Sequence, residues 1–359
     1  MDPGARVLVA LSGGVDSAVA AALLVGAGRP VVGVFMRNGV SGSAARRSCC
    51  SLSDARDARA VADRLGAPFY VHDLQRPFAR LMDAFARDYA AGLTPNPCVV
   101  CNNELKFGEL LALADDLGCA AVATGHYARV TGGRLRRAAD ADKDQSYLLG
   151  GLTSAQRARA IFPLGELTKP RVRATARELG LPVADKPDSA DICFVPGGDY
   201  RAVVTERLPG LGKPGALLDR QGREVGRHAG VAAFTVGQRR GLGAALGEPA
   251  YVTDIDPRSG DVRVGRRADL ARGACLVRQV GWQVDAPRPR QALVQLRHRH
   301  VPEPAELVEL ADGAVRVAFR QPSLSVTPGQ YAVFYEGDMV LGSGRIAREE
   351  RAAAATAAP

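Results

Sequence analysis

The chain has 359 residues, more than one domain of the common ~100–200-residue size, which predicts two or three compact units. Apolar residues make up 47% and charged residues 24%, a balance that excludes a disordered chain, a collagen-like chain and a coiled coil. The net charge is +9, and only five of the 47 basic residues are lysines, which leaves 42 arginines. Codon bias can produce such a composition, but an excess of guanidinium also suits a phosphate-rich partner, because its planar fork binds two phosphate oxygens at once.

Strand-like and helix-like segments alternate through the first half of the chain. The expected strands cover residues 6–11, 30–36, 68–71 and 119–124. The expected helices cover residues 17–27, 53–65, 104–117 and 170–179, with Ser53 and Thr168 as N-caps and a glycine after each of the last three. This alternation predicts an α/β domain over residues 1–199, with helices on both faces of a parallel sheet and a ligand site at the carboxyl ends of its strands.

Near residue 200 the pattern changes, because glycine and proline become dense and short alternating segments replace the helices. Turn signals predict hairpins within residues 215–226, 251–265, 305–320 and 330–346. We therefore expect a small, mostly β central domain over residues 200–273, a C-terminal β-barrel over 274–348 and a frayed tail over 349–359.

The first chemical motif, residues 11–17 (LSGGVDS), lies between the first expected strand and the first expected helix. Small residues let backbone N–H groups curl around an anion, and the helix N-terminus adds a positive dipole. The motif matches neither G-x-x-x-x-G-K-[ST] nor G-x-G-x-x-G. Its SGGxDS pattern resembles the pyrophosphate loop of the ATP pyrophosphatases, which split ATP into AMP and pyrophosphate. Asp16, at the mouth of such a site, is an expected partner of Mg²⁺.

Two further motifs contain cysteines. In residues 94–102 (TPNPCVVCN), two prolines argue against a helix, so Cys98 and Cys101 are expected on a rigid turn before the helix at Glu104. A helix N-terminus would lower the pKa of such thiols. The C-x-x-C spacing allows a redox pair, half a zinc site or part of a cluster, although Cys49-Cys50 has poor spacing for a second zinc pair.

The remaining cysteines divide into one candidate and two core residues. Cys193 lies in the segment Asp191-Ile192-Cys193-Phe194, just past the parallel domain, whereas Cys119 and Cys275 have the apolar surroundings of inert core thiols. Seven cysteines in a chain without an expected signal peptide argue against a structural disulfide framework.

Seven motifs in this order together resemble the tRNA-specific 2-thiouridylases, a resemblance that runs from about residue 6 to residue 347. They are SGGVDS, the thiol loop after TPNP, ATGHY at 123–127, KDQSY at 143–147, DICF at 191–194, GQRRGLG at 237–243 and VTPGQ at 326–330.

The resemblance implies a sulfurtransferase that thiolates C2 of the wobble uridine, position 34, of tRNA. The uridine is flipped out of its stack and ATP adenylates its C2 oxygen. Cys193 carries sulfur as a persulfide, and Cys101 is the catalytic nucleophile that releases it. The products are AMP, pyrophosphate and a Cys101–Cys193 disulfide. This disulfide is transient, because it is reduced after each turnover, and is therefore compatible with a reducing cytosol.

The resemblance also assigns binding residues. ATP would contact Ala10, Leu11, Ser12, Gly13, Gly14, Val15, Asp16, Ser17, Met36 and Gly125, together with Mg²⁺. The target base would contact Asn96, Pro97 and Cys98. The tRNA would contact His126, Lys143, Asp144, Gln145, Arg297, His298 and Gln330.

The partners implied by the resemblance are tRNAs for Glu, Gln and Lys, together with a cysteine desulfurase or sulfur-relay proteins. No apolar run near the start approaches the ~20 residues needed to cross a bilayer, and residues 1–6 lack the features of a signal peptide. We therefore expect a cytoplasmic protein that does not bind membranes, with a monomer as the default oligomeric state.

One position departs from the family pattern. Many members have Asp where this chain has Cys98, and a thiol is a poorer acid–base group at oxygen than a carboxylate. Cys98, Cys101 and Cys193 could instead hold a 4Fe–4S cluster with one open iron. Apart from the Mg²⁺ that accompanies ATP, no other metal ion is expected. Two rival functions stay open: an ATP pyrophosphatase that adenylates a carbonyl for attack by an amine, and a non-catalytic RNA-binding protein.

Overall fold

The computed structural model describes residues 2, 4–40, 51–188, 192–209, 214–243 and 249–349. The chain forms two compact units. The first comprises Met1–Ala86, Pro97–Pro209 and Gly337–Val340, and the second comprises Arg87–Asn96, Gly210–Glu336 and Leu341–Pro359. The short segment Arg87–Asn96 thus belongs to the second unit, although it interrupts the first along the chain. No local signal in the sequence indicates this interruption.

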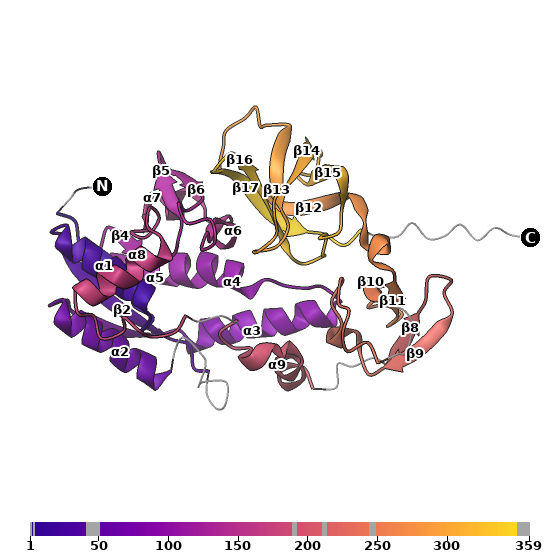
Figure 1. The fold of residues 1–359 in the computed structure, drawn as a ribbon, viewed down its shortest axis with the longest axis horizontal. Coiled ribbons are helices and arrows are strands. Elements are labelled where there is room, and N and C mark those ends of the chain that lie inside the picture. The colour runs from indigo at the N-terminus through magenta and orange to yellow at the C-terminus, as the bar shows by residue number, and fades with distance from the viewer. Residues whose placement is uncertain are drawn as a thin grey trace, which may run out of the picture. The chain divides into compact units, whose positions relative to one another are not determined.

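A five-stranded parallel sheet forms the centre of the first unit, in the order β3-β2-β1-β4-β7 (Figure 1). Its strands are β1 (Val7–Ala10), β2 (Val31–Arg37), β3 (Phe69–Asp73), β4 (Ala121–Ala123) and β7 (Ala160–Ile161). β1 lies between β2 and β4, with Val7 opposite Val31 and Ala121. A central parallel strand is buried on both faces, which explains the continuous apolar run in its sequence. The predicted parallel sheet is confirmed.

The first part of the chain also forms helices. They are α1 (Val15–Gly26), α2 (Leu52–Arg64), α3 (Gln75–Ala90), α4 (Pro97–Val100), the π-helix η2 (Cys101–Glu109), α5 (Leu110–Asp116), α6 (Ser146–Leu149), α7 (Ser154–Ala158), α8 (Lys169–Glu178) and α9 (Tyr200–Arg207). Of these, α1, α2 and α5 contact strands of this sheet. Alternate β1 residues Val7 and Val9 share a core with α1, α2 and α8, and α1 contacts α8 (Figure 1). Leu8 is also fully buried, so both faces of β1 are covered.

The helix that carries Cys98 and Cys101 begins at Pro97, so the predicted rigid turn before Glu104 is wrong. Proline is tolerated in the first turn of a helix, because the N–H that it lacks would have no partner there. From Cys101 the helix continues as a π-helix, a wide form that is frequent at functional sites. The side-chain amide of Gln156 donates to the carbonyls of Asn103 (2.8 Å) and Phe107 (2.9 Å) and thereby stabilises it.

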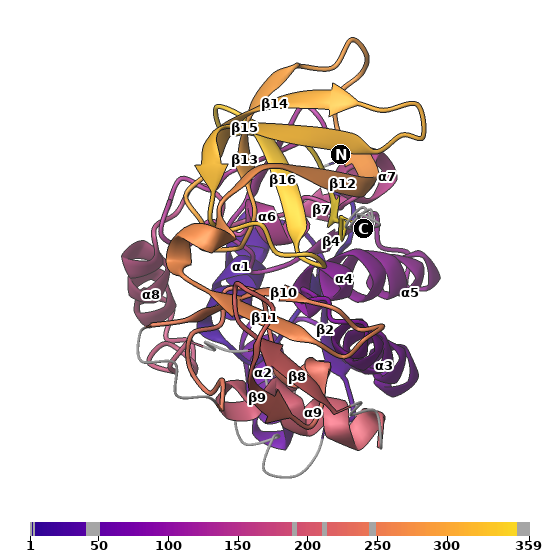
Figure 2. The same ribbon diagram turned by 90° about the vertical axis from the view of Figure 1, so that its right-hand side faces the viewer.

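The second unit is built from β-strands. β8 (Gly215–Leu218), β9 (Glu224–His228), β10 (Tyr251–Ile255) and β11 (Val262–Gly265) form a four-stranded sheet. The barrel strands are β12 (Arg272–Trp282), β13 (Gln291–Gln295), β14 (Glu303–Glu309), β15 (Val315–Ser323), β16 (Tyr331–Glu336) and β17 (Met339–Ile346). Pairing of β12 with both β15 and β17 closes the barrel, whose strands are orange to yellow in Figure 2. The predicted hairpins and C-terminal barrel are confirmed.

In the described part of the chain, no helix combines the length and the hydropathy that crossing a bilayer requires.

Candidate active site

A cavity of about 340 Å³ lies in the first unit, at the carboxyl ends of β1, β2 and β4. Its volume falls within the range of about 300–1,000 Å³ that is common for small-molecule sites. All but one of the predicted ATP-binding residues line it, namely Ala10, Leu11, Ser12, Gly14, Val15, Asp16, Ser17, Met36 and Gly125. Gly13 is the exception. The predicted position of a ligand site, at the carboxyl ends of parallel strands, therefore contains a cavity.

The loop of residues 11–17, here called the glycine loop, is fixed by a glycine that cannot be replaced and by hydrogen bonds within the loop. Gly13 has a φ of +72°, and a Cβ there would lie 2.4 Å from the Asp54 carbonyl oxygen, so only glycine fits. The Ser17 hydroxyl donates to the Gly14 carbonyl (3.1 Å) and accepts from the Ser12 N–H (3.1 Å). α1 begins immediately after Gly14, and the N–H groups of a first helical turn have no partner within the helix. The loop and helix end together suit an anion.

Gly125 brings the end of β4 against the start of α1. A Cβ at this position would lie 2.6 Å from the Ser17 nitrogen and 2.7 Å from the Asp16 carbonyl carbon. Real Cβ atoms do not approach backbone this closely, so the contact requires glycine whatever its φ. The close approach of the two backbones therefore fixes the cavity wall where the end of β4 meets the start of α1.

Four of the chain's five lysines surround this cavity. Lys106, Lys143 and Lys186 line it, and Lys169 bonds to Asp16 in its wall. Among these lysines, the resemblance assigns only Lys143 to binding, and Lys106, Lys169 and Lys186 are not among the predicted site residues. A signal was available, because lysine is rare in a chain with so many arginines. A lysine ammonium is compact, whereas a guanidinium is a wide planar fork.

Lys186 fixes the glycine loop to α2. Its ammonium donates to the Gly13 carbonyl (2.9 Å) and to the carboxylates of Asp54 (2.6 Å) and Asp57 (2.5 Å). Burial by itself would lower the pKa of Lys186, but hydrogen bonds and charge attraction from the two carboxylates raise it. Asp54 also accepts from the N–H of Ser51, the N-cap of α2. One charged contact thus joins the loop to the first turn of that helix.

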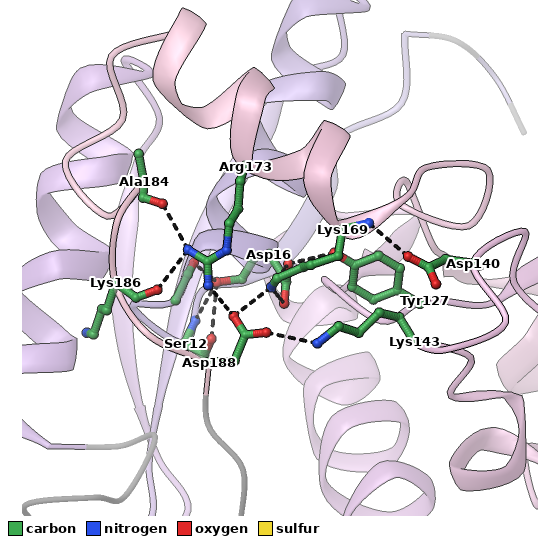
Figure 3. Close-up of polar contacts among 12 residues, drawn as sticks. Ser12, Asp16, Tyr127, Asp140, Lys143, Lys169, Arg173, Ala184, Lys186 and Asp188 are labelled. Carbon is green, nitrogen blue, oxygen red and sulfur yellow. Dashed lines mark hydrogen bonds and ion pairs between the residues drawn. The ribbon is translucent and has the colours of Figure 1, made fainter. Parts of the chain in front are cut away.

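A second charged network occupies the wall beside α8 (Figure 3). Asp188 accepts from Lys143 (3.0 Å), Lys169 (2.9 Å) and Arg173 (2.6 Å). Lys169 also donates to both carboxylate oxygens of Asp16, each at 2.7 Å. Burial would raise the pKa of Asp188, but hydrogen bonds from Lys169 and Lys143 lower it to about 2. Asp188 is therefore a carboxylate at neutral pH.

Asp16, the predicted Mg²⁺ partner, is thus bound to an ammonium in this structure. It also accepts from the Tyr127 hydroxyl (2.8 Å), and burial, with the charge of Asp16, raises the pKa of that phenol. Carboxylate oxygens suit Mg²⁺, and a cation bound here would share Asp16 with Lys169. A Mg²⁺ role for Asp16 stays a prediction.

His126 is buried in the same cavity wall. Its Nδ1 lies 2.6 Å from the Thr124 hydroxyl and its Nε2 lies 3.3 Å from the Lys106 ammonium. Burial, and then the charge of Lys106, hold the pKa of His126 well below its usual value. Because Lys106 can only donate, we assign the neutral tautomer with the proton on Nδ1. The predicted tRNA contact by His126 stays a prediction.

The neutral state of His126 predicts a pH dependence. Below a pH of about 6.5 the unfolded chain protonates this histidine and the folded chain does not, so acid favours unfolding. We expect His126→Gln to remove this loss of stability, which is at most about 2 kcal/mol between pH 6.5 and pH 5. Urea unfolding at both pH values measures it, with His72→Gln on β3 as the control. Equal pH dependence in wild type and His126→Gln would contradict the assignment.

The thiol segments of the first unit both contact α3. Cys98, Cys101 and Cys193 are each half-buried. Phe194, next to Cys193, packs edge-to-face on Phe78 and Phe85, with ring centroids 5.6 and 5.1 Å apart. At the other end of the π-helix that begins with Cys101, Glu109 pairs with Arg80 of α3 at 3.8 Å. α3 thus packs against the segment of Cys193 through Phe194 and reaches the far end of the π-helix through an exposed ion pair.

The donor set for an iron–sulfur cluster does not fit. Within the described ranges, no group of three or more His, Cys, Asp or Glu side chains is arranged to hold a metal ion. Cys98, Cys101 and Cys193 all lie in those ranges, so the cluster hypothesis finds no support. Asp191, Cys49 and Cys50 lie outside the described residues.

The two predicted core thiols are buried, as expected. Burial raises the pKa of Cys119, and it raises that of Cys275 to about 12. A thiol with a raised pKa forms little thiolate, the reactive species, at neutral pH.

The predicted tRNA-binding residues divide between the units. In the first unit, Lys143 and Gln145 line the cavity, and Gln145 accepts from the Tyr127 N–H (2.9 Å). Asp144 accepts from the N–H groups of Ala138 (3.0 Å) and Ser146 (3.1 Å) and so fixes a turn.

In the second unit, the guanidinium of Arg297 donates to the Thr327 hydroxyl (2.5 Å). The Gln295 amide donates to the carbonyl of His298 (2.8 Å). Gln330 donates to the carbonyls of Thr94 (2.9 Å) and Pro95 (3.3 Å), just before Asn96. Contacts of these residues with tRNA stay predictions.

Models of known protein families match most of the chain. A family model described as "tRNA methyl transferase HUP domain" matches residues 5–197. Models described as "tRNA methyl transferase PRC-barrel domain" and "Aminomethyltransferase beta-barrel domain" match residues 202–266 and 272–346.

Curated relatives match nearly end to end. Proteins named tRNA-specific 2-thiouridylase MnmA from Chloroflexus aurantiacus and Mycolicibacterium smegmatis are each 49% identical, over 96% of this chain and 99% of their own length. One from Rhodococcus opacus is 50% identical, over 95% of this chain and 97% of its own length. The methyltransferase wording of the family models describes single domains, so the full-length relatives decide the family.

Proposed function

The chain belongs to the tRNA-specific 2-thiouridylase family, and we propose that it uses ATP to convert the wobble uridine of tRNA, position 34, to 2-thiouridine. The observation that carries this proposal is the cavity that joins the SGGVDS loop to three lysines at the carboxyl ends of the parallel strands. A nucleotide triphosphate needs a site of this kind, with backbone N–H groups and cations around its phosphates.

The first half-reaction activates the uridine. The C2 oxygen attacks the α-phosphorus of ATP, the bond to the β-phosphate oxygen breaks, and pyrophosphate leaves. The glycine loop and the first turn of α1 would hold the phosphates, and Mg²⁺ bound with ATP would neutralise part of their charge. Adenylation turns the C2 oxygen into a good leaving group, AMP.

The second half-reaction delivers sulfur. The terminal sulfur of a Cys193 persulfide attacks C2, a C–S bond forms and AMP leaves. The Cys101 thiolate then attacks the Cys193 Sγ, so the S–S bond to the transferred sulfur breaks and 2-thiouridine is released. A Cys101–Cys193 disulfide remains, which a cellular dithiol reduces with two electrons. Support comes from the half-buried state of both thiols and from the packing of Phe194, next to Cys193, on α3.

The finer assignments belong to the same proposal. Asn96, Pro97 and Cys98 would contact the flipped base, tRNAs for Glu, Gln and Lys would be the substrates, and a cysteine desulfurase or a sulfur-relay protein would load Cys193. We propose that the protein acts in the cytoplasm as a monomer, with its three domains near residues 1–199, 200–273 and 274–348.

Mass spectrometry of tRNA nucleosides tests the reaction, after incubation with ATP, Mg²⁺ and a persulfide donor. We expect uridine to gain the mass of one oxygen-to-sulfur exchange, with one AMP released per sulfur. AMP release with an amine joined to the substrate would instead indicate an amine-attacking ATP pyrophosphatase. Absence of tRNA-dependent AMP release would indicate a non-catalytic RNA-binding protein.

A substitution of Gln330 tests whether the position of Thr94 and Pro95, which precede Cys98 and Cys101 in the sequence, matters for thiolation. Its amide donates to the Thr94 and Pro95 carbonyls, and the Thr94 N–H donates to the Pro328 carbonyl (2.8 Å). Two lost hydrogen bonds of about 0.5–1.5 kcal/mol each predict that Gln330→Ala lowers the thiolation rate about fivefold to 100-fold. Single-turnover assays measure the rate, and filter binding measures tRNA affinity.

Gln291→Ala is the matched control, because the side chain of this exposed barrel glutamine accepts a hydrogen bond from Arg320 (3.2 Å) and lies within the second unit. We expect it to behave as wild type. If Gln330→Ala weakens tRNA binding as much as it slows thiolation, the residue acts as an RNA contact and not through Thr94.

A further inference from the structure

We propose that Lys143, Lys169 and Arg173 form a polyphosphate subsite whose anion in this structure is the Asp188 carboxylate, and that the β- and γ-phosphates of ATP take the place of that carboxylate. The inference rests on the proposed use of ATP. It adds residues outside the SGGVDS loop to the nucleotide site and assigns Asp188 a competing role.

The three cations come from two different parts of the fold and meet at one point (Figure 3). Lys143 precedes α6, Lys169 is the first residue of α8, and Arg173 follows one turn later on α8. Their nitrogens lie 2.6–3.0 Å from Asp188 oxygens. The Lys169 side chain is only 10% exposed, so the surrounding residues restrict its position more than they would for a lysine on the surface.

The three cations lie next to the glycine loop, where they could contact phosphate groups bound there. Lys143 and Asp188 line the same cavity as the glycine loop, and Lys169 bonds to Asp16 in the first turn of α1. A pyrophosphate group held on the loop would therefore lie beside these cations. Ammonium and guanidinium groups bind phosphate oxygens through short, charge-assisted hydrogen bonds, and the guanidinium fork can bind two.

The charges favour exchange of the anion. The side chains joined by these ion pairs carry three positive charges, on Lys143, Lys169 and Arg173, and two negative ones, on Asp16 and Asp188. Asp140 accepts from the backbone N–H of Lys169 and is not ion-paired with these cations. A single carboxylate has two oxygens for these donors, whereas two phosphate groups offer more oxygens and more negative charge. In a partly buried site, both the additional oxygens and the additional charge strengthen the attraction between the anion and the three cations.

Among the charged residues of the cluster, Asp188 can move with the smallest disturbance of secondary structure. Asp16 is fixed within α1, and both Lys169 and Arg173 are fixed on α8. Asp188 lies in a stretch with no helix or strand, and its side chain is 33% exposed. Withdrawing this side chain breaks its three ionic contacts but no secondary structure.

Calorimetric titration of the full chain with ATP, inorganic pyrophosphate and AMP tests the subsite. Asp188→Asn removes the competing charge at nearly constant shape, so we expect ATP and pyrophosphate to bind about tenfold more tightly and AMP to change less than threefold. The matched control is Asp185→Asn on the same segment, whose exposed carboxylate pairs with Arg177. Unchanged or weaker pyrophosphate binding by Asp188→Asn overturns the proposal.

Lys143→Gln is an independent variant for the case in which Asp188→Asn fails to fold, because its side chain is 39% exposed. We expect it to weaken pyrophosphate binding about tenfold, again with AMP nearly unaffected. Equal weakening of AMP and pyrophosphate, or no change, overturns the subsite. These titrations need neither tRNA nor sulfur, so failure of the thiolation assay and failure of this subsite are separate results.

Discussion

Serine in place of Cys101 or Cys193 is expected to lower 2-thiouridine formation at least about 1,000-fold and to leave ATP affinity within about twofold of wild type. The reason is chemical, because serine keeps the size of the side chain but neither stores sulfur as a persulfide nor attacks an S–S bond at neutral pH. Nucleoside mass spectrometry measures the product, and calorimetry measures ATP binding.

Cys119→Ala is the matched control, since it removes a thiol that is buried and whose pKa burial raises. We expect it to keep full activity. Full turnover by both Cys101→Ser and Cys193→Ser would refute sulfur relay through these residues and favour an amine-attacking ATP pyrophosphatase. Iron and sulfide in the anaerobically purified wild-type protein, lost in Cys98→Ser, would instead restore the cluster hypothesis.

The sequence predicts the order of elements well where the signals are local. Apolar runs mark β1 and β2, glycines follow α2, α5 and α8, and turn residues mark the hairpins of the second unit. Boundaries are less certain, since α2 is capped by Ser51 and not by Ser53. The Pro97 error has the same origin: the rule that proline breaks helices omits the first turn, where proline fits.

Contacts between distant residues could not be predicted in this way. The bond between Lys169 and Asp16 joins residues 153 positions apart, and nothing near Lys169 in the sequence indicates an acidic partner. Arg87–Asn96 belongs to the second unit because Gln330, 236 positions after Thr94, bonds to its carbonyls. The sequence therefore locates the glycine loop but not the cations around it.

Alanine at Gly125 is expected to weaken ATP binding about 100-fold. Its Cβ would lie 2.6 Å from the Ser17 nitrogen, so either the end of β4 or the first turn of α1 has to shift. The atoms that it meets are backbone and cannot rotate away. Overpacking of this kind costs about 1–3 kcal/mol in a well-packed site, and a shift of the helix N-terminus also misplaces the N–H groups meant for phosphate.

Gly26→Ala, at the other end of α1, separates this clash from a general effect of alanine in the same helix. Nothing lies within 4 Å of its added Cβ, so we expect unchanged ATP affinity and a gain of about 0.5–1 kcal/mol in stability. Calorimetry with ATP and thermal unfolding of both variants measure the two effects. Normal ATP binding by Gly125→Ala would contradict this prediction, because it would mean that ATP tolerates the shift of β4 or of α1 that the new methyl group requires.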